Sequence, residues 1–291
     1  MVCIDNNTRG SMNKDNAIGM FMGLFIGDAL GAPLEFKRPH EVKGLHKEMT
    51  GGGVHKAAVG EWTDDGAMAV CIADAYINHR GFSPAGIAHN YKQWEEHGTF
   101  GTRDYVFDIG NTCAAGIARM TPSHPYAGGS TVNDSGNGSI MRLAPVLLVN
   151  HKKLSSAIAE SVASALMTHG NSDTIKYITA FAHEMYRGKM LRQYAELRQW
   201  STDRPDGGGG SIMYAYNTAW TSVFRHKTFE HALVYAVNLG YDADTVGAVT
   251  GMLAGRIYGY SAIPQRWLEK LVKHDELLVM ANDLYYLYEG E

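Results

Sequence analysis

The feature that most constrains the fold is the spacing of glycine in two long apolar segments. Glycine recurs at intervals of four residues in 23–31 and again in 247–255. A glycine inside a helix costs about 1 kcal/mol relative to alanine, so a repeated series is favoured only where another backbone must approach closely. Residues four apart share one face of a helix. We therefore expect both segments to be helices in close contact with neighbouring helices.

Helical patterns follow one another along the chain, separated by short breaks at Gly, Pro or Asp. No alternating apolar and polar run is long enough to predict a strand. The expected helices are 16–30, 67–78, 84–97, 110–120, 138–150, 155–167, 172–187, 189–200, 211–225, 228–238, 243–258, 264–273 and 275–288. Because no internal repeat or charge run marks a second domain, we predict a single compact all-α domain over 16–291, preceded by a flexible tail, 1–15.

Composition excludes several classes of function. The net charge of −4 provides no basic surface for nucleic acid or for an anionic membrane. The longest apolar candidate for a membrane span, 17–36, is interrupted by Asp28 and Pro33, and the start of the sequence has no signal-peptide pattern. The three cysteines are odd in number and widely spaced. We therefore expect a cytoplasmic, monomeric protein without a disulfide framework or a zinc site.

Two acidic clusters lie about 180 residues apart, and each contains two carboxylates and a threonine hydroxyl. Such an all-oxygen set suits a hard cation, and four carboxylates brought together would repel one another without one. Taken singly, either cluster could be a helix cap, because each precedes an apolar helical pattern. Taken together, they predict a site for two divalent cations, Mg²⁺ or Mn²⁺. The candidate ligands are Thr63, Asp64, Asp65, Asp242, Asp244 and Thr245.

Three glycine-rich segments, 50–53, 134–142 and 206–211, are candidate binding loops. Glycines before a helix expose backbone N–H groups at its positive end, which suits a phosphate. Tyr214, just after the third segment, could stack on a base. The alternative is that these segments are flexible surface loops. None of them matches a Rossmann or P-loop motif.

Several ordered motifs resemble those of the ADP-ribosylglycohydrolase family from about residue 17 to the end of the chain. The motifs are Gly27-Asp28-Ala29-Leu30-Gly31 with Glu35-Phe36, Thr63-Asp64-Asp65 with Met68, Asp108-Ile109-Gly110-Asn111-Thr112, Gly136-Asn137-Gly138 with Met141-Arg142, Thr168-His169, and 240–247 with Ala254-Gly255 and Tyr258-Gly259. The resemblance implies an orthogonal all-α bundle with a binuclear Mg²⁺ or Mn²⁺ centre at the base of a cleft. It also implies release of ADP-ribose from mono-ADP-ribosylated protein, with arginine as the modified side chain in the arginine-directed members.

The resemblance also assigns roles to individual residues. Thr63, Asp64, Asp65 and Asp244 resemble the ligands of one ion, and Asp242, Asp244 and Thr245 those of the other, with Asp244 bridging. The expected catalytic residues are Asp108, Glu35 and Asp65, and the expected substrate-binding residues are Gly136, Asn137, Gly138, Ser139, Asn111, His169 and Tyr214. Asp28 resembles a structural partner near the site. Which of Asp108 and Glu35 handles a proton stays open.

Two positions depart from the family pattern. Gly66 stands where the family usually has a threonine, and Tyr241 where it usually has a small residue. Because a lost hydroxyl near a metal can weaken metal binding, we expect Gly66→Thr to preserve or raise activity. Three hypotheses stay open: a hydrolase of ADP-ribosyl-arginine, a hydrolase of another linkage (serine, O-acetyl-ADP-ribose or a small-molecule adduct), and a non-catalytic ADP-ribose-binding or immunity protein. Asp108 favours the first and Gly66 the third.

Overall fold

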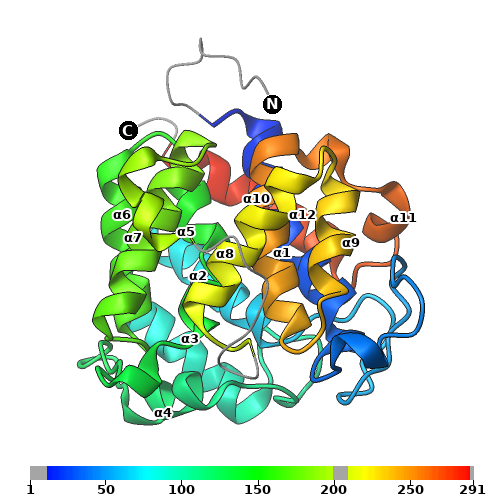
Figure 1. Ribbon diagram of the computed structural model, residues 1–291. Coiled ribbons are helices and arrows are strands. Elements are labelled where there is room, and N and C mark those ends of the chain that lie inside the picture. The colour runs from blue at the N-terminus through cyan, green and yellow to red at the C-terminus, as the bar shows by residue number, and fades with distance from the viewer. Residues whose placement is uncertain (1–11, 199–208, 289–291) are drawn as a thin grey trace.

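Helix α1 (Lys14–Gly31) and helix α10 (Ala243–Tyr258) lie side by side at the centre of the molecule in this computed structural model, which describes residues 12–198 and 209–288 (Figure 1). The two helices are antiparallel. A methyl group added at Gly27 would lie 2.0 Å from the carbonyl oxygen of Gly247, and one at Gly23 would lie 2.2 Å from that of Gly251. The glycine series therefore brings the two backbones into direct contact. The sequence predicts a close approach for each segment, and the structure shows that the two segments approach each other.

Ten further α-helices surround this pair within the described residues. They are α2 (Asp64–His79), α3 (Pro84–His97), α4 (Asn111–Arg119), α5 (Ala144–Val149), α6 (Leu154–Leu166), α7 (Ser172–Arg187), α8 (Ile212–Arg225), α9 (Phe229–Val237), α11 (Gln265–Leu268) and α12 (His274–Tyr286). The same residues form isolated β-bridges but no strand. The prediction of a compact all-α fold is confirmed.

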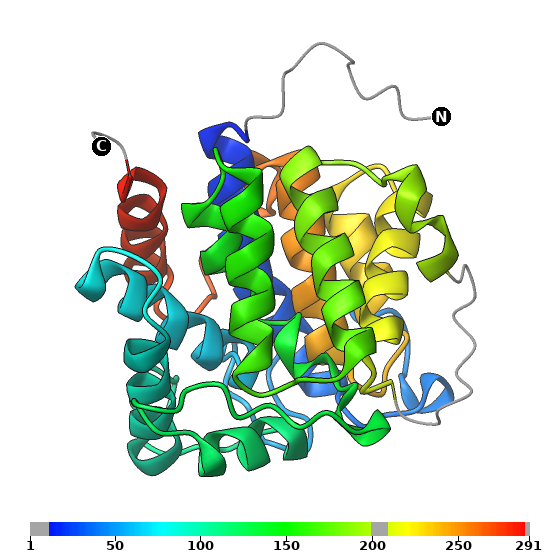
Figure 2. The ribbon, with the colours of Figure 1, turned by 90° about the vertical axis from the view of Figure 1, so that its left-hand side faces the viewer.

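The surrounding helices leave one end of the central pair, the end of α1 and the start of α10, directed away from the chain ends. Helices α8 and α9 pack against α10, and α6 packs against α7. Helix α4 lies across the lower end of the molecule, at a steep angle to α6 and α7 (Figure 2). The start of α1 and the end of α12 lie together at the upper end (Figures 1 and 2). The end of α1 and the start of α10 are consequently directed away from the chain ends.

The expected helix 138–150 is wrong in its first half. Residues 137–139 form a short 3₁₀ turn, and the α-helix begins only at Ala144 with Pro145 in its first turn. The backbone N–H of Asn137 donates to the carbonyl of Gly210 at 3.0 Å, outside any helix. Proline has no N–H and is tolerated mainly in a first helical turn, so it marks the true start.

Two other expected helices are shorter than predicted. The described part of 189–200 is a 3₁₀ stretch, Arg192–Leu197, with Tyr194 outside helical geometry, and the N–H of Leu191 before it donates to the Glu184 carboxylate. The expected helix 264–273 contains only α11, and Lys273 adopts a positive φ of 61°. The remaining helices begin and end within three residues of the expected positions.

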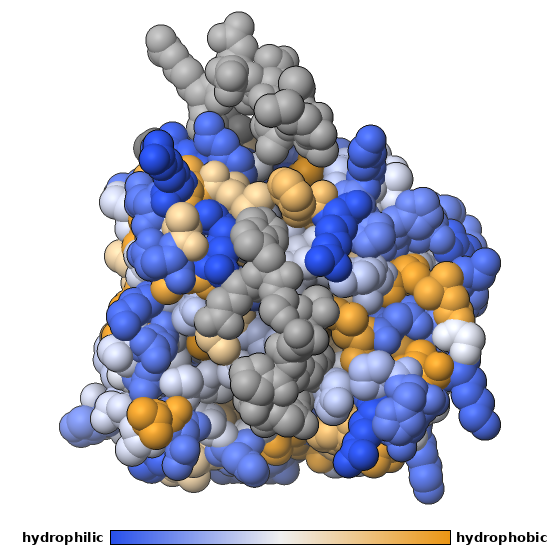
Figure 3. Space-filling model, viewed as in Figure 1, coloured by the Kyte–Doolittle hydropathy of each residue, from blue (hydrophilic) through white to orange (hydrophobic). Residues whose placement is uncertain are grey.

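Helix α1 with its next turn, Lys14–Leu34, is long and apolar enough to span a membrane by length and composition, but it is buried inside the fold as a core element. In Figure 3 hydrophilic residues cover most of the face shown, with hydrophobic residues in small groups. Residues 1–11 of the expected tail lie outside the described residues. Met12 is buried and α1 begins at Lys14, so the ordered fold includes the last residues of the expected tail 1–15. The flexible tail stays a prediction for residues 1–11.

Candidate metal centre and cleft

Asp28 joins the end of α1 to the start of α2. Its carboxylate, fully buried, accepts hydrogen bonds from the backbone N–H of Thr63 at 2.9 Å and of Gly66 at 3.0 Å. A buried carboxylate needs such donors because it has lost its hydration. Asp28 therefore fixes the first turn of α2 beside α1, in agreement with its expected structural role.

The two acidic clusters meet where α2 and α10 begin. The Oγ1 of Thr63 lies 3.2 Å from the Oδ2 of Asp65 and 3.4 Å from the Oδ2 of Asp244. From the other cluster, the Oγ1 of Thr245 lies 3.3 Å from the same Oδ2 of Asp65. The contact of α1 with α10 and the Asp28 bridge to α2 bring these segments together.

The helix-cap interpretation does not account for these side chains. Thr63 and Asp242 occupy the N-cap positions of α2 and α10, but neither side chain accepts a capping hydrogen bond. The Thr63 hydroxyl instead faces the carboxylates. The Oδ2 of Asp242 accepts a hydrogen bond at 2.8 Å from the side-chain amide of Asn137. Both side chains are therefore directed toward the site.

The electrostatics of the cluster call for a cation. Burial, reinforced by neighbouring carboxylates, raises the pKa of Asp64 to about 6 and those of Asp65 and Asp244 well above the usual range. The Oδ1 atoms of Asp65 and Asp244 are buried without a hydrogen-bond partner, and no lysine or arginine among the described residues forms an ion pair with these three. Oxygen atoms of Asp28, Asp65 and Asp244 lie within 4.8 Å of one another, as do those of Asp64, Asp108 and Asp244. This donor set fits hard divalent cations, which would neutralise the carboxylates.

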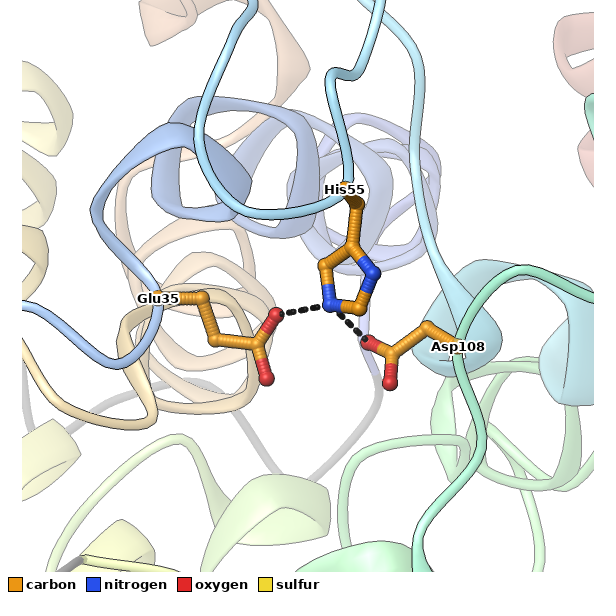
Figure 4. Close-up of side chains that lie close together, drawn as sticks. All are labelled: Glu35, His55 and Asp108. Carbon is orange, nitrogen blue, oxygen red and sulfur yellow. Dashed lines mark ion pairs between the residues drawn. The ribbon is translucent and has the colours of Figure 1, made fainter.

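A second group, Glu35, His55 and Asp108, lies close together at the cleft, which Glu35 and Asp108 line; we call this group the mouth of the cleft (Figure 4). The Nε2 of His55 lies 2.7 Å from the Oε2 of Glu35 and 3.5 Å from the Oδ2 of Asp108. Burial first, and then nearby carboxylates, raises the pKa of Glu35 to about 10 and that of Asp108 to about 9. Burial also lowers the pKa of His55. One imidazole thus lies between the two carboxyl groups that the sequence leaves as alternatives for proton handling.

His55 is a site residue that the sequence did not predict. Among 13 scattered histidines, none forms a close pair in the sequence. The available signal was the glycine cluster 50–53, in which Gly51, Gly52 and Gly53 all have positive φ. This cluster forms a tight turn, closed by the pairing of Gly52 with Ala57, and the turn carries the histidine over the site.

Most of the expected site residues line one cleft of about 550 Å³. Those on its wall are Glu35, Asp64, Asp108, Asn111, Gly136, Asn137, Gly138, His169, Asp242, Asp244 and Thr245. Thr63 and Asp65 are buried beneath the floor. The cleft therefore has an acidic floor and a wall formed by the loop around Gly136.

Two expected substrate-binding residues are not on the cleft wall. Ser139 is fully buried. Tyr214, on the first turn of α8, is also buried and packs with Ala236 and Val246, because that face of α8 meets α9 and α10. In this structure Tyr214 is a core residue, and its stacking role stays a prediction.

Two of the three glycine-rich segments lie side by side at the cleft. The N–H of Asn137 donates to the carbonyl of Gly210, and the N–H of Ile212 donates to that of Ser135 at 3.1 Å. Residues 206–208 of the third segment lie outside the described residues. The described part nonetheless connects the loop around Gly136 to the start of α8.

The structure gives a packing reason for Gly66. A methyl group there would lie 2.6 Å from the ring of Trp62 and 3.0 Å from that of Phe25. Trp62 is buried, and its Nε1 donates to the carbonyl of Val272 at 3.0 Å, so the indole has little freedom to move. Gly66 therefore leaves room for this large ring. A glycine at this position does not indicate that activity has been lost.

We therefore reverse the expectation for Gly66→Thr. Because the side chain overlaps a fixed indole, the variant should unfold at a lower denaturant concentration, with a loss of about 1–3 kcal/mol, and its activity should not increase. Gly81→Ala is the matched control, since its methyl group meets only the Tyr288 hydroxyl at 3.5 Å. Wild-type stability together with raised turnover in Gly66→Thr would contradict this account.

The second departure, Tyr241, lies in a strained turn. Its φ is 60°, in the left-handed region that favours glycine. Its N–H donates to the carbonyl of Lys37 at 2.7 Å, and its carbonyl accepts from the N–H of Phe36 at 2.5 Å. The turn preceding α10 is thus hydrogen-bonded to the segment that follows Glu35, which couples the acidic floor to the mouth of the cleft.

Comparison with known proteins agrees with this arrangement. The sequence pattern of the family described as ADP-ribosylglycohydrolase matches residues 10–291. The chain is 31% identical to an ADP-ribosylarginine hydrolase Tri1 of Pseudomonas putida (strain GB-1), covering 93% of this chain and 78% of the relative. It is 33% identical to an ADP-ribosyl-[dinitrogen reductase] glycohydrolase of Rhodospirillum rubrum, covering 90% of this chain and 92% of the relative.

A solved structure is similar over nearly the whole fold. It is described as an ADP-ribosylglycohydrolase-related protein complex and superposes with a TM-score of 0.82 at 32% identity, covering 94% of this chain and 98% of that one. The helical fold, the full-length match and the acidic cleft lead to one conclusion. The chain belongs to the ADP-ribosylglycohydrolase family.

Proposed function

We propose that this protein removes mono-ADP-ribose from arginine side chains of proteins, using two divalent cations, Mg²⁺ or Mn²⁺, held by the acidic floor of the cleft. The observation that carries this proposal is the contact between the two distant acidic clusters beneath a cleft walled by a glycine-rich loop. Two relatives named for arginine or dinitrogen reductase de-ADP-ribosylation support the linkage.

The floor residues would hold the cations. Asp64, Asp65, Asp242 and Asp244 supply carboxylates, and Asp244 is close enough to both clusters to be shared. When bound, two such cations supply Lewis acidity for activating water and for orienting the ribose hydroxyls. On the opposite wall, a methyl group at Gly138 would lie 2.4 Å from the Sγ of Cys113, so only glycine lets this loop run along the cleft.

The carboxyl groups at the mouth are suited to the leaving side chain. Cleavage of an N-glycosidic bond passes through an oxocarbenium-like state, and a leaving guanidine is strongly basic. Without metal, burial and the neighbouring carboxylates raise the pKa of Asp108, and an arriving guanidinium would favour its ionised form. A carboxylate and a guanidinium then form a bidentate pair. Glu35 and His55 lie beside this carboxyl group, with the Nε2 of His55 at 3.5 Å from the Oδ2 of Asp108.

Asp108 should determine which linkage is cleaved. Asp108→Ala is expected to reduce hydrolysis of ADP-ribosyl-arginine by at least about 100-fold while changing the affinity for free ADP-ribose little, because the lost pair is made only with the guanidinium. Single-turnover assays and calorimetry with ADP-ribose on the same preparation measure the two effects. A thermal melt tests the alternative that Asp108 caps α4.

The structure already weakens the capping alternative, since the N-cap of α4 is Gly110 and no side chain caps this helix. Asp108→Asn serves as the matched control because it keeps the shape and removes the charge. If Asp108→Ala loses stability and retains arginine hydrolysis, the specificity role is wrong. A large loss of Mn²⁺ affinity would instead assign Asp108 to the cation site, because its carboxylate lies near those of Asp64 and Asp244.

The linkage itself is tested by comparing substrates. Purified protein with Mn²⁺ should release free ADP-ribose from an arginine-modified protein faster than from a serine-modified one. Faster release from serine would favour the second hypothesis. Tight ADP-ribose binding without release from either substrate would favour a non-catalytic binder. The packing reason for Gly66 removes the residue that had favoured that last hypothesis.

A further inference from the structure

Arg142 is a fully buried cation beside the cleft. Its Nη2 donates to the carbonyl of Ser164 at 2.9 Å and to the Oγ1 of Thr168 at 2.7 Å. Its guanidinium lies 5.3 Å from the centre of the Tyr91 ring. No carboxylate among the described residues forms an ion pair with it. Such an arginine is costly to bury, so its contacts deserve a functional explanation.

The contact with Thr168 favours one direction for a second hydrogen bond, from the threonine hydroxyl to His169. The Oγ1 of Thr168 lies 2.7 Å from the Nδ1 of His169. An arginine can only donate, so the Thr168 oxygen accepts from Arg142 and its own hydroxyl proton is left to donate. Among the hydrogen bonds of the described residues, the acceptor within reach of this proton is the Nδ1 of His169. Donation to Nδ1 requires that this ring nitrogen is unprotonated. A neutral imidazole in this state carries its proton on Nε2.

The Nε2 of His169 faces the loop that walls the cleft. A methyl group at Gly136 would lie 3.1 Å from this nitrogen, and one at Gly138 would lie 3.5 Å from it. His169 itself lines the cleft. Burial, and then the positive charge of Arg142, lowers the pKa of His169 to about 3, so the ring stays neutral at physiological pH. Its one remaining donor is therefore directed at the cleft.

We infer that Arg142 and Thr168 are positioning residues that hold His169 in the Nε2–H tautomer, so that the ring is a permanent neutral donor to an anionic oxygen of the bound ligand. This inference rests on the proposed function, under which that oxygen belongs to the diphosphate of ADP-ribose. The arrangement explains a buried arginine without a carboxylate, because the guanidinium both orients the threonine hydroxyl and opposes protonation of the ring.

Thr168→Val and Thr168→Ser form the matched pair that tests the relay. Valine keeps the shape of threonine and removes the hydroxyl, whereas serine keeps the hydroxyl. Nitrogen-15 NMR of the histidine rings, recorded with Mg²⁺ and without ligand, should show His169 as Nε2–H in the wild type and in Thr168→Ser. In Thr168→Val the Nδ1–H form should become populated. Calorimetry with ADP-ribose should give about tenfold weaker binding for valine only, as expected for losing a hydrogen bond to a charged group.

The outcomes separate the inference from the proposed function. An Nδ1–H ring in the wild type, or an unchanged tautomer in Thr168→Val, overturns the relay. A changed tautomer with an unchanged affinity for ADP-ribose overturns the donor role of His169. If the wild type does not bind ADP-ribose although the NMR results are as expected, the proposed function fails while the relay is supported. Equal Mg²⁺ affinity in all three proteins confirms that the floor of the cleft is unaffected.

Discussion

Replacing Asp244 by asparagine should abolish metal-dependent hydrolysis and, in the same protein, should stabilise the metal-free state. The carboxylate belongs to the second acidic cluster and reaches Thr63 of the first, so under the proposed function its loss removes a shared ligand. Turnover should fall by at least about 100-fold, since even changes outside the ligand set cost 10–100-fold. Without metal, however, this buried carboxylate has an unpartnered oxygen and a pKa raised by burial and by its acidic neighbours.

The sign of the stability effect follows from that raised pKa. A carboxyl group whose pKa is higher in the folded than in the unfolded protein stabilises the fold at low pH, and this contribution is lost as the pH rises through the folded-state pKa. At pH 8 the wild type without metal should therefore be less stable than Asp244→Asn. At 100 times the dissociation constant, Mn²⁺ should stabilise the wild type by about 2.7 kcal/mol for each occupied site, and the variant much less.

Thermal melts with and without Mn²⁺ measure the two changes in stability, and an activity assay measures the loss of turnover. Asp283→Asn is the control, because Asp283 is exposed on α12 and should change neither quantity. If Asp244→Asn bound Mn²⁺ as tightly as the wild type, the bridging assignment would be wrong. A marked destabilisation of the metal-free variant would mean that the carboxylate has an undetected stabilising partner.

Gly27→Ala should produce the largest loss of stability. The added methyl group would lie 2.0 Å from the carbonyl oxygen of Gly247. The methyl position is fixed by the α1 backbone and the oxygen belongs to the α10 backbone, so neither can rotate away. Overpacking usually costs 1–3 kcal/mol; here the whole contact between α1 and α10 must open, so we expect more than about 3 kcal/mol. Denaturant unfolding measures this loss.

The same variant should also damage the site at a distance. Asp28 follows Gly27, and Asp244 lies on the part of α10 that would move, so Mn²⁺ affinity should fall together with stability. Gly81→Ala is again the control and should stay within about 0.5 kcal/mol of the wild type. A Gly27→Ala protein with wild-type stability would show that the glycine series does not bring these helices into contact.

Much of the fold was predictable because glycine spacing and helical periodicity are local signals. The series in 23–31 and 247–255 identified the central helices, and the acidic residues pointed to one shared site. Features that depend on a distant partner were not predictable. The helix expected over 138–150 starts late because Asn137 bonds to Gly210, far along the chain. Gly66 looked like a lost hydroxyl because the position of the Trp62 ring is a tertiary fact.

The same distinction applies to the site. Residues in compact motifs, such as Asp64 and Asp108, were found from the sequence and line the cleft. His55 was missed because nothing next to it in the sequence indicates that its turn folds over Glu35. Tyr214 was expected at the cleft because of its position after a glycine cluster, but the packing of α8 decides where its ring lies.

The measurement that tests the central claim most directly is anomalous diffraction from crystals grown with Mn²⁺. We expect two peaks roughly 3.5–4 Å apart, as in other two-metal sites, enclosed by Asp64, Asp65, Asp242 and Asp244. A single peak among these carboxylates would contradict the binuclear centre. No peak there, or a peak only between Glu35, His55 and Asp108, would contradict the proposal that the two acidic clusters meet around metal.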